Sequence, residues 1–120
     1  LFITDYDFEQ FHRNCCHQII KYLKPIVGVK VTYGRAAKII AIYLKTAVII
    51  PNKARGNKCE LVHPPIDNIL LSNLGTAINL TTIKDIRWTT LTEKEYCNMV
   101  REIKAVIKRF DWTLEEFWKP

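Results

Sequence analysis

The segment from Tyr33 to Ile49 constrains the fold of this chain more than any other stretch of the sequence. Apolar residues recur in it at helical spacing, and they occupy most sides of the expected helix. The residues on one face are Ala36, Ala37, Ile40, Ala41, Leu44 and Val48. A helix that is apolar on most sides is buried among other elements. With Thr32 as a suitable N-cap, the pattern predicts a largely buried second helix in the middle of a bundle.

A first helix is predicted before this segment. Thr4 is a plausible N-cap, with Asp7 three residues later in the position of a capping box. An apolar stripe begins at Phe8 and continues at helical spacing until Lys24-Pro25, where we expect the helix to end. Residues 26–31 are short and β-branched, and because no partner strand is evident we expect an extended linker there.

A third helix is predicted to begin at His63-Pro64-Pro65, because proline is pre-organised for the first turn of a helix. Asp67 lies where a carboxylate favours the helix dipole. Gly75 is a natural stop signal. The stretch from Thr76 to Arg87 has no clear periodicity, and we expect it to be irregular.

Two further helices are predicted near the C-terminus. Thr92 and Glu95 form a capping box before an amphipathic stripe, and Thr113 with Glu116 forms a second one. A chain of 120 residues has the size of one domain, and we see no repeat or linker in it. The sequence therefore predicts an all-α fold, a single-domain bundle of about five helices over residues 1–120.

Charge is distributed unevenly along the chain. Residues 10–59 hold ten basic residues and no acidic one, whereas all twelve carboxylates lie outside this basic block. The net charge of +6 is therefore the sum of a strongly positive block, residues 10–59, and a negative remainder of the chain. Such asymmetry favours a polyanionic partner, because it gives salt-dependent affinity for phosphates.

The residues of the basic block that we expect to contact nucleic acid lie on one edge of the second helix and in the loop after it. They are Arg35, Lys38, Lys45, Lys53, Arg55 and Lys58. The alternative is a solvated face that acidic residues of the C-terminal half neutralise in the fold.

The hydropathy of the chain and the spacing of its cysteines predict the cellular location of the protein. No apolar run approaches the roughly 20 residues needed to span a bilayer, so we expect no membrane contact. Cys15 and Cys16 are adjacent, and the spacing lacks the framework of a disulfide-rich secreted domain. Free thiols in the cytoplasm are the better interpretation.

A metal site is the alternative interpretation of the same cysteines. His12 and Cys16 lie four apart on one helical face, with His17, Cys59 and His63 also present. No paired C-x-x-C half accompanies them. We therefore expect inert thiols, with no metal and no cofactor.

The turn His63-Pro64-Pro65-Ile66-Asp67 is the best candidate for chemistry. Two prolines fix the backbone, so His63 and Asp67 stand in a defined relation at a helix start. Together with Lys38 they are the candidate catalytic residues of an enzyme acting on a nucleotide or nucleic acid. The competing interpretation is that Asp67 caps the helix and His63 bonds a neighbour.

This turn also carries a resemblance. Gly34-Arg35-Ala36-Ala37-Lys38, a helix reaching Tyr43-Leu44-Lys45, and the His63 to Asp67 turn together resemble a family of small uncharacterised proteins. That family has a Gly-x-Ala-x-Lys helix, a His-x-Pro-Ile-Asp turn and an acidic-aromatic end like Glu115-Glu116-Phe117-Trp118. The resemblance covers most of the chain. It implies a shared fold and a shared site at Lys38, His63 and Asp67, without an established activity.

A second resemblance is to helix-hairpin-helix DNA glycosylases. Pro65-Ile66-Asp67 resembles their Pro-Val-Asp turn, which would make Asp67 the catalytic aspartate. The closely spaced glycine pair of their hairpin is missing between Lys24 and Arg35. The chain also leaves little room for a second domain to hold an extruded base. We do not expect glycosylase activity.

Tryptophans cluster near the end of the chain. Trp112, Phe117 and Trp118 can close the core, or they can anchor a protein partner or a second copy of the chain. Our sequence-based hypothesis is a helical binding module for nucleic acid, without chemistry of its own.

Overall fold

The computed structural model describes residues 4–27, 30–53, 55 and 60–120, and in these ranges every regular element is a helix. The predicted all-α fold is therefore confirmed. In chain order the helical elements are α1 (Asp5–Val27), α2 (Tyr33–Leu44), η1 (Lys45–Ile49), α4 (Asn68–Ala77), η2 (Thr81–Asp85), η3 (Trp88–Thr90), α5 (Glu93–Ile107) and η4 (Trp112–Phe117).

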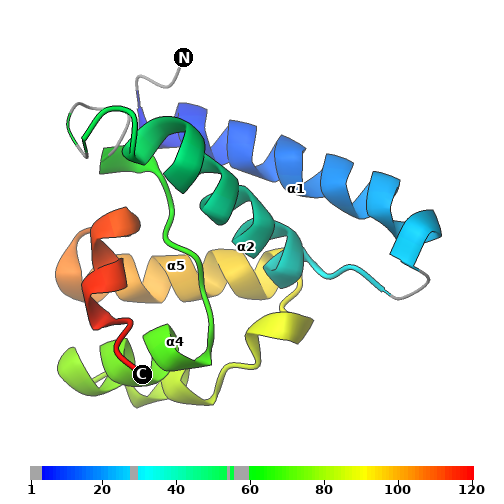
Figure 1. Cartoon of the computed structure of the whole chain (residues 1–120). Coiled ribbons are helices and arrows are strands. Elements are labelled where there is room, and N and C mark those ends of the chain that lie inside the picture. The colour runs from blue at the N-terminus through cyan, green and yellow to red at the C-terminus, as the bar shows by residue number, and fades with distance from the viewer. Residues whose placement is uncertain (1–3, 28–29, 54, 56–59) are drawn as a thin grey trace.

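The helices are arranged around α2 (Figure 1). In this view α1 lies across the top, α5 crosses the middle and α4 lies at the bottom. α2 contacts both α1 and α5, while η2 and η4 both pack against α4. An extended segment before Asp67 leads down past α5 to the start of α4. α1 and α5, which are far apart in the sequence, are thereby held in one bundle.

α2 has the central position that its sequence predicts. Its buried residues are Tyr33, Gly34, Ala36, Ala37, Ile40, Ala41 and Leu44. Thr32 is the N-cap, and its side-chain oxygen accepts a hydrogen bond from the Arg35 backbone N–H at 3.3 Å. The outer face is open, since Ile39 and Tyr43 are 44% and 65% exposed.

The second helix does not continue as a regular α-helix to Ile49. After Leu44 the chain forms a π-turn, in which the Ile50 N–H donates to the Lys45 carbonyl at 3.0 Å. The wider turn places Ile49 in the core, at 4% exposure. The residue type alone does not reveal such a change of spacing.

The prediction that Lys24-Pro25 ends the first helix was wrong, because α1 continues to Val27. Proline removes one backbone donor and clashes with the carbonyl four residues earlier. Here it lies in the last turn and is exposed, so little of the helix follows it. Ile26 belongs to the helix rather than to the expected linker, and residues 28–29 of that linker lie outside the described part of the chain.

The third predicted helix begins later and ends later than expected. Residues 62–67 are extended, and Asp67 is the N-cap of α4, with its Oδ1 accepting from the Leu70 N–H at 3.0 Å. Gly75 does not stop the helix, which continues to Ala77. Gly75 instead allows η2 to approach, since a Cβ there would lie 2.5 Å from Lys84 Cγ.

The two predicted capping boxes had different outcomes. The Thr92–Glu95 box at the start of α5 is present with both of its reciprocal hydrogen bonds. The box predicted at Thr113 was wrong, because Asp111 caps η4 and accepts from the Thr113 N–H at 2.8 Å. The final helix is therefore a short 3₁₀ helix that begins at Trp112.

One connected apolar core joins these elements, with side chains from α1, α2, α4, α5 and η4. Phe8, Leu70, Leu74, Ile103 and Leu114 are almost completely buried in it. Two histidines, His12 and His63, are the buried polar side chains of the described residues. No described helix combines the length and the apolar character that crossing a bilayer requires.

Candidate functional site

The fold brings acidic residues of the C-terminal half onto part of the basic block. Lys38 Nζ lies 3.5 Å from Asp67 Oδ2, and Lys45 Nζ lies 3.0 Å from Glu115 Oε2. These two predicted nucleic-acid contacts are therefore paired within the chain. Both pairs are partly exposed to solvent. Surface pairs of this kind contribute about 0–1 kcal/mol each, so a competing phosphate could displace them at little cost.

Arg13 of the block is paired as well. Its Nε lies 2.8 Å from Glu93 Oε2, while His17 Nε2 lies 2.7 Å from Glu93 Oε1. The hydrogen bond with His17, together with the charge of Arg13, lowers the pKa of the Glu93 carboxyl. Glu93 therefore connects the start of α5 to the middle of α1.

Five further cations of the block form no ion pair with another described side chain, and all five are exposed: Lys21, Lys24, Lys30, Arg35 and Lys53. Arg55 is exposed as well. Lys58 lies outside the described residues. The positive surface that the fold leaves uncovered thus begins at the C-terminal end of α1 and the start of α2.

Asp67 joins three elements through its two carboxylate oxygens. Oδ1 caps α4, and Oδ2 accepts from Trp118 Nε1 at 2.7 Å and faces Lys38 Nζ. Lys38 also lies over the ring of Trp88, with Nζ 4.5 Å from its centroid. Both oxygens of Asp67 are therefore occupied by partners in the chain, which is the arrangement of a structural clamp.

His63 lies elsewhere, in the core. Its Nδ1 is 2.9 Å from the Tyr96 hydroxyl, and its ring packs on Phe8 and Phe110 with centroids 4.8 Å away in each case. The structure thus brings Lys38 and Asp67 together but gives His63 different partners. The three candidate catalytic side chains do not converge on one cavity.

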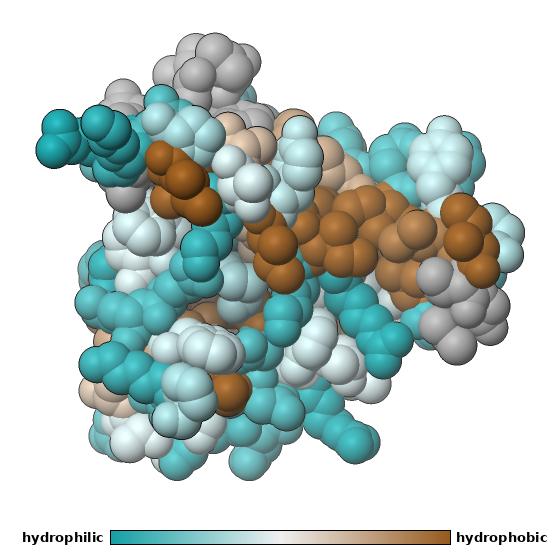
Figure 2. All heavy atoms as spheres, in the orientation of Figure 1, coloured by the Kyte–Doolittle hydropathy of each residue, from teal (hydrophilic) through white to brown (hydrophobic). Residues whose placement is uncertain are grey.

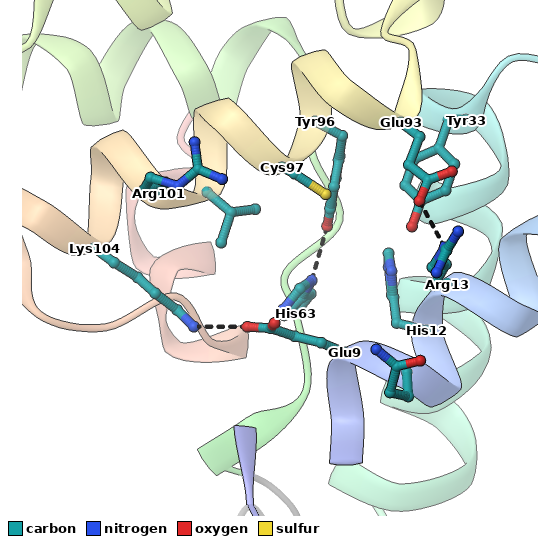
Figure 3. Close-up of a pocket in the computed structure, with 12 residues that line it drawn as sticks. Glu9, His12, Arg13, Tyr33, His63, Glu93, Tyr96, Cys97, Arg101 and Lys104 are labelled. Carbon is teal, nitrogen blue, oxygen red and sulfur yellow. Dashed lines mark hydrogen bonds and ion pairs between the residues drawn. The ribbon is translucent and has the colours of Figure 1, made fainter. Parts of the chain in front are cut away.

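His63 instead lines a cavity of about 340 Å³ between α1 and α5 (Figure 3). Aromatic and imidazole rings form its inner wall, and charged side chains of α1 and α5 surround its mouth. Its lining residues include His12, Tyr33, His63, Tyr96, Cys97, Val100, Glu9, Arg13, Glu93, Arg101 and Lys104. A second bridge crosses this mouth, since Lys104 Nζ lies 3.4 Å from Glu9 Oε1.

Both histidines of the cavity are uncharged at neutral pH. Burial lowers the pKa of His12 to about 4. Burial also lowers the pKa of His63 well below its ordinary value, helped by the neighbouring His12 and Lys104. Their ring centroids are only 4.7 Å apart, and two adjacent imidazolium ions would repel each other.

His12 has one nitrogen without a partner. Its Nδ1 faces Cys16 Sγ at 3.8 Å. Burial raises the pKa of the Cys16 thiol to about 12, so that thiol keeps its proton. If the thiol donates to Nδ1, the proton of neutral His12 lies on Nε2.

That Nε2 atom is the buried side-chain N or O atom without a hydrogen-bond partner among the described residues. An unpaired buried donor costs roughly 1–3 kcal/mol and is rare in folded proteins. Because His12 lines the cavity, its unpaired Nε2 is a candidate contact for a ligand.

The metal hypothesis finds no support in the described residues. No group of three histidine, cysteine or acidic side chains gathers there in an arrangement that could hold an ion. Cys59, one of the possible ligands, lies outside the described part of the chain. The thiols of Cys15, Cys16 and Cys97 are free.

The exposed apolar surface is on α1 and α2 rather than at the C-terminal tryptophans. Trp112 and Phe117 are partly buried against the core, and of the expected C-terminal set Trp118 is the exposed one, at 44%. Figure 2 shows an apolar band where α1 and α2 lie side by side. A groove there is lined by Phe11, Asn14, Cys15, Gln18, Ile19, Ile39, Ile40 and Tyr43.

Sequence reasoning did not identify the cavity. Tyr96, Arg101 and Lys104 carry no motif, and they meet α1 only through the fold. A signal was present for His12, since Phe8 and Cys16 lie four residues to either side of it on the buried stripe of α1. A histidine on such a stripe needs a polar partner or a special role.

No family model, curated protein or solved structure matches this chain. The resemblance drawn from the Lys38, His63 and Asp67 segments therefore remains a prediction. Any functional assignment rests on the geometry described above.

Proposed function

We propose that this protein is a nucleic-acid-binding module whose contact surface is the uncovered part of the basic block. The observation that carries the proposal is the absence of any carboxylate between Glu9 and Glu60, combined with exposed cations on α1 and α2. A surface of one sign attracts phosphates over a distance of about a Debye length.

The cations fall into an unpaired group and a paired group. Lys21, Lys24 and Arg35 are exposed on α1 and α2 without ion pairs to described side chains. Lys38 and Lys45 are held by Asp67 and Glu115. We expect the first group to supply the initial contacts, and the second to join only if phosphate displaces its carboxylates.

The test is a titration of the chain with labelled duplex DNA, single-stranded DNA and RNA at several salt concentrations. With about five phosphate contacts, a plot of the logarithm of the binding constant against the logarithm of the salt concentration should have a slope of roughly −4 to −5. Reversal of Lys21, Lys24 and Arg35 to glutamate should reduce the slope by about 2–3 and weaken binding to all sequences alike.

A matched control variant distinguishes the effect of this surface on binding from the effect of the net charge of the protein. Lys84, Lys94 and Lys119 are exposed cations outside the block, and reversing all three changes the net charge by the same amount. This control should retain most of the binding. Equal losses in the two triple variants, or no binding at low salt, would contradict the proposal. A third triple variant at Lys53, Arg55 and Lys58 tests the loop contribution.

The enzyme alternative has less geometric support. Lys38 and Asp67 form one cluster with Trp118, whereas His63 is buried beside Tyr96. Our proposal is therefore of binding without chemistry. It includes a cytoplasmic location, which the free thiols support.

A protein partner is the second candidate function, and the α1–α2 groove favours it. Ile39, Ile42 and Tyr43 of α2 are large exposed apolar residues beside this groove. Exposed Lys21 and Lys24 follow the groove residue Ile19 along α1, and Arg35 precedes Ile39 along α2. A suitable partner is therefore an amphipathic helix with acidic flanks. Ile39→Ser should weaken such docking strongly while leaving the salt slope for DNA nearly unchanged, because it removes an apolar contact without adding a charge, and this distinguishes the two candidates.

A further inference from the structure

The cavity between α1 and α5 lies outside the surface proposed for nucleic-acid contact, and it combines the features of a ligand site (Figure 3). Its volume of about 340 Å³ lies near the lower end of the range for small-molecule pockets. It is therefore large enough for a single-ring compound and too small for an extended polymer segment.

The inner wall of the cavity offers one unsatisfied donor. His12 is buried and lines the cavity, and its Nε2 has no partner among the described residues. When the Cys16 thiol donates to Nδ1, which lies 3.8 Å from Sγ, the proton of neutral His12 is on Nε2. A ligand that presents an oxygen acceptor would satisfy it, as polar groups of specific pockets commonly do.

The mouth of the cavity favours a negative charge. Arg13, Arg101 and Lys104 line it, against the carboxylates of Glu9 and Glu93. Arg13 bonds Glu93, and Lys104 pairs with Glu9, so both carboxylates already have cationic partners.

Arg101 has no carboxylate partner among the described residues. One of its nitrogens donates to Asn98 Oδ1 on the same helix. Its planar guanidinium has further donors and can bind a carboxylate or a phosphate through two parallel hydrogen bonds.

The walls between these two ends are apolar. Tyr33, Tyr96 and Val100 line the cavity, and the Tyr33 and Tyr96 rings lie with centroids 5.4 Å apart. An inorganic ion would leave these walls without contact. An aromatic or otherwise compact organic body would cover them.

We propose that this cavity binds a small organic anion, with its charged group at Arg101 and an oxygen acceptor at His12 Nε2. The shared chemistry is an anionic head on a single-ring body, and the head is a carboxylate or a phosphate ester. The site is independent of the basic surface on α1 and α2.

The experiment follows backbone amide NMR signals of the 120-residue chain during titration with three probes. The probes are 4-hydroxybenzoate, 4-nitrophenyl phosphate and the neutral 4-hydroxybenzyl alcohol. Saturable shifts at Cys97, Val100 and Arg101 with at least one anion support the site, and the tighter anion identifies the head group. The neutral probe should bind at least tenfold more weakly. No saturable shift with either anion, or equal binding of the neutral probe, overturns the proposal.

Two variants test the roles of Arg101 and His12 in binding the anion. Arg101→Gln should weaken the anion at least fivefold, whereas Lys94→Gln removes the same charge from the same helix outside the cavity and should leave binding unchanged. His12→Phe should also weaken binding at least fivefold, and its Tm should be unchanged or higher because the unpaired donor is gone. A large fall in Tm for His12→Phe together with unaffected binding in Arg101→Gln would show that the histidine is only structural and would overturn the assignment.

Discussion

At the scale of single residues, two glycines show how packing constrains positions that the sequence leaves open. A Cβ on Gly34 would lie 2.0 Å from the Trp88 carbonyl oxygen and 3.0 Å from Leu91 Cβ. The Gly34 N–H also donates to the Leu91 carbonyl at 3.0 Å. The start of α2 therefore lies directly against the backbone that precedes α5. At Gly75 the nearest atom is the flexible Lys84 side chain.

Gly34→Ala should therefore lower the free energy of unfolding by about 2–3 kcal/mol, because a backbone carbonyl cannot move aside without shifting the chain. The gain in helix propensity, roughly 1 kcal/mol, does not offset this clash. Gly75→Ala should cost less, since Lys84 can rotate away. Urea unfolding of both variants measures the difference, and a Gly34→Ala protein as stable as the parent would refute the expected contact.

At the scale of elements, helical periodicity and caps predicted α1, α2 and α5, and Thr32 and Thr92 were correctly identified as caps. The errors have local causes. Pro25 was read as a stop although it lies in a last turn, and Gly75 was read as a stop although it serves close packing. The site was harder to predict, because Asp67 and Lys38 are 29 residues apart and meet only in the folded chain.

Asp67 links α2, α4 and the C-terminal segment, so its loss should affect all three. Asp67→Ala removes a cap, the Trp118 hydrogen bond and the Lys38 pair, and should cost about 2 kcal/mol of unfolding free energy. Asp67→Asn keeps an oxygen for the cap and should cost less.

The control is Asp85→Ala, at an exposed end of η2, which should change stability by less than about 0.5 kcal/mol. Chemical denaturation compares the three variants. A loss at Asp67 no larger than that at Asp85 would show that the clamp does not stabilise the fold.

At the scale of the whole molecule, buried histidines make the folded state sensitive to acid. His12 has a folded pKa of about 4, and that of His63 is also lowered. The unfolded chain binds protons at both near pH 6.5, so it holds more protons than the folded chain below that pH. Stability is therefore fully present above pH 6.5 and falls as the solution becomes more acidic.

Between pH 6.5 and 5 the free energy of unfolding should fall by up to about 1.4 kcal/mol per pH unit for each histidine. Carboxylates contribute mainly below this window. Urea midpoints at half-unit steps of pH give the slope, and His12→Phe should reduce it by about half. A stability that stays constant from pH 7 to 5 would mean that these imidazoles do not remain uncharged in the fold.

The π-turn from Lys45 to Ile49 also affects how the chain can change in length. Its hydrogen bond from Ile50 to Lys45 encloses one residue more than an α-helical turn does. An α-helix turns by about 100° per residue, so four α-helical residues cover nearly the same rotation as the five residues of this wider turn. Deleting exposed Thr46 or Ala47 should therefore convert the turn to regular α-helical spacing and keep Ile49 on the side that faces the core. The loss of one residue should be accepted more readily here than inside α2, where it would rotate the following residues by about 100°.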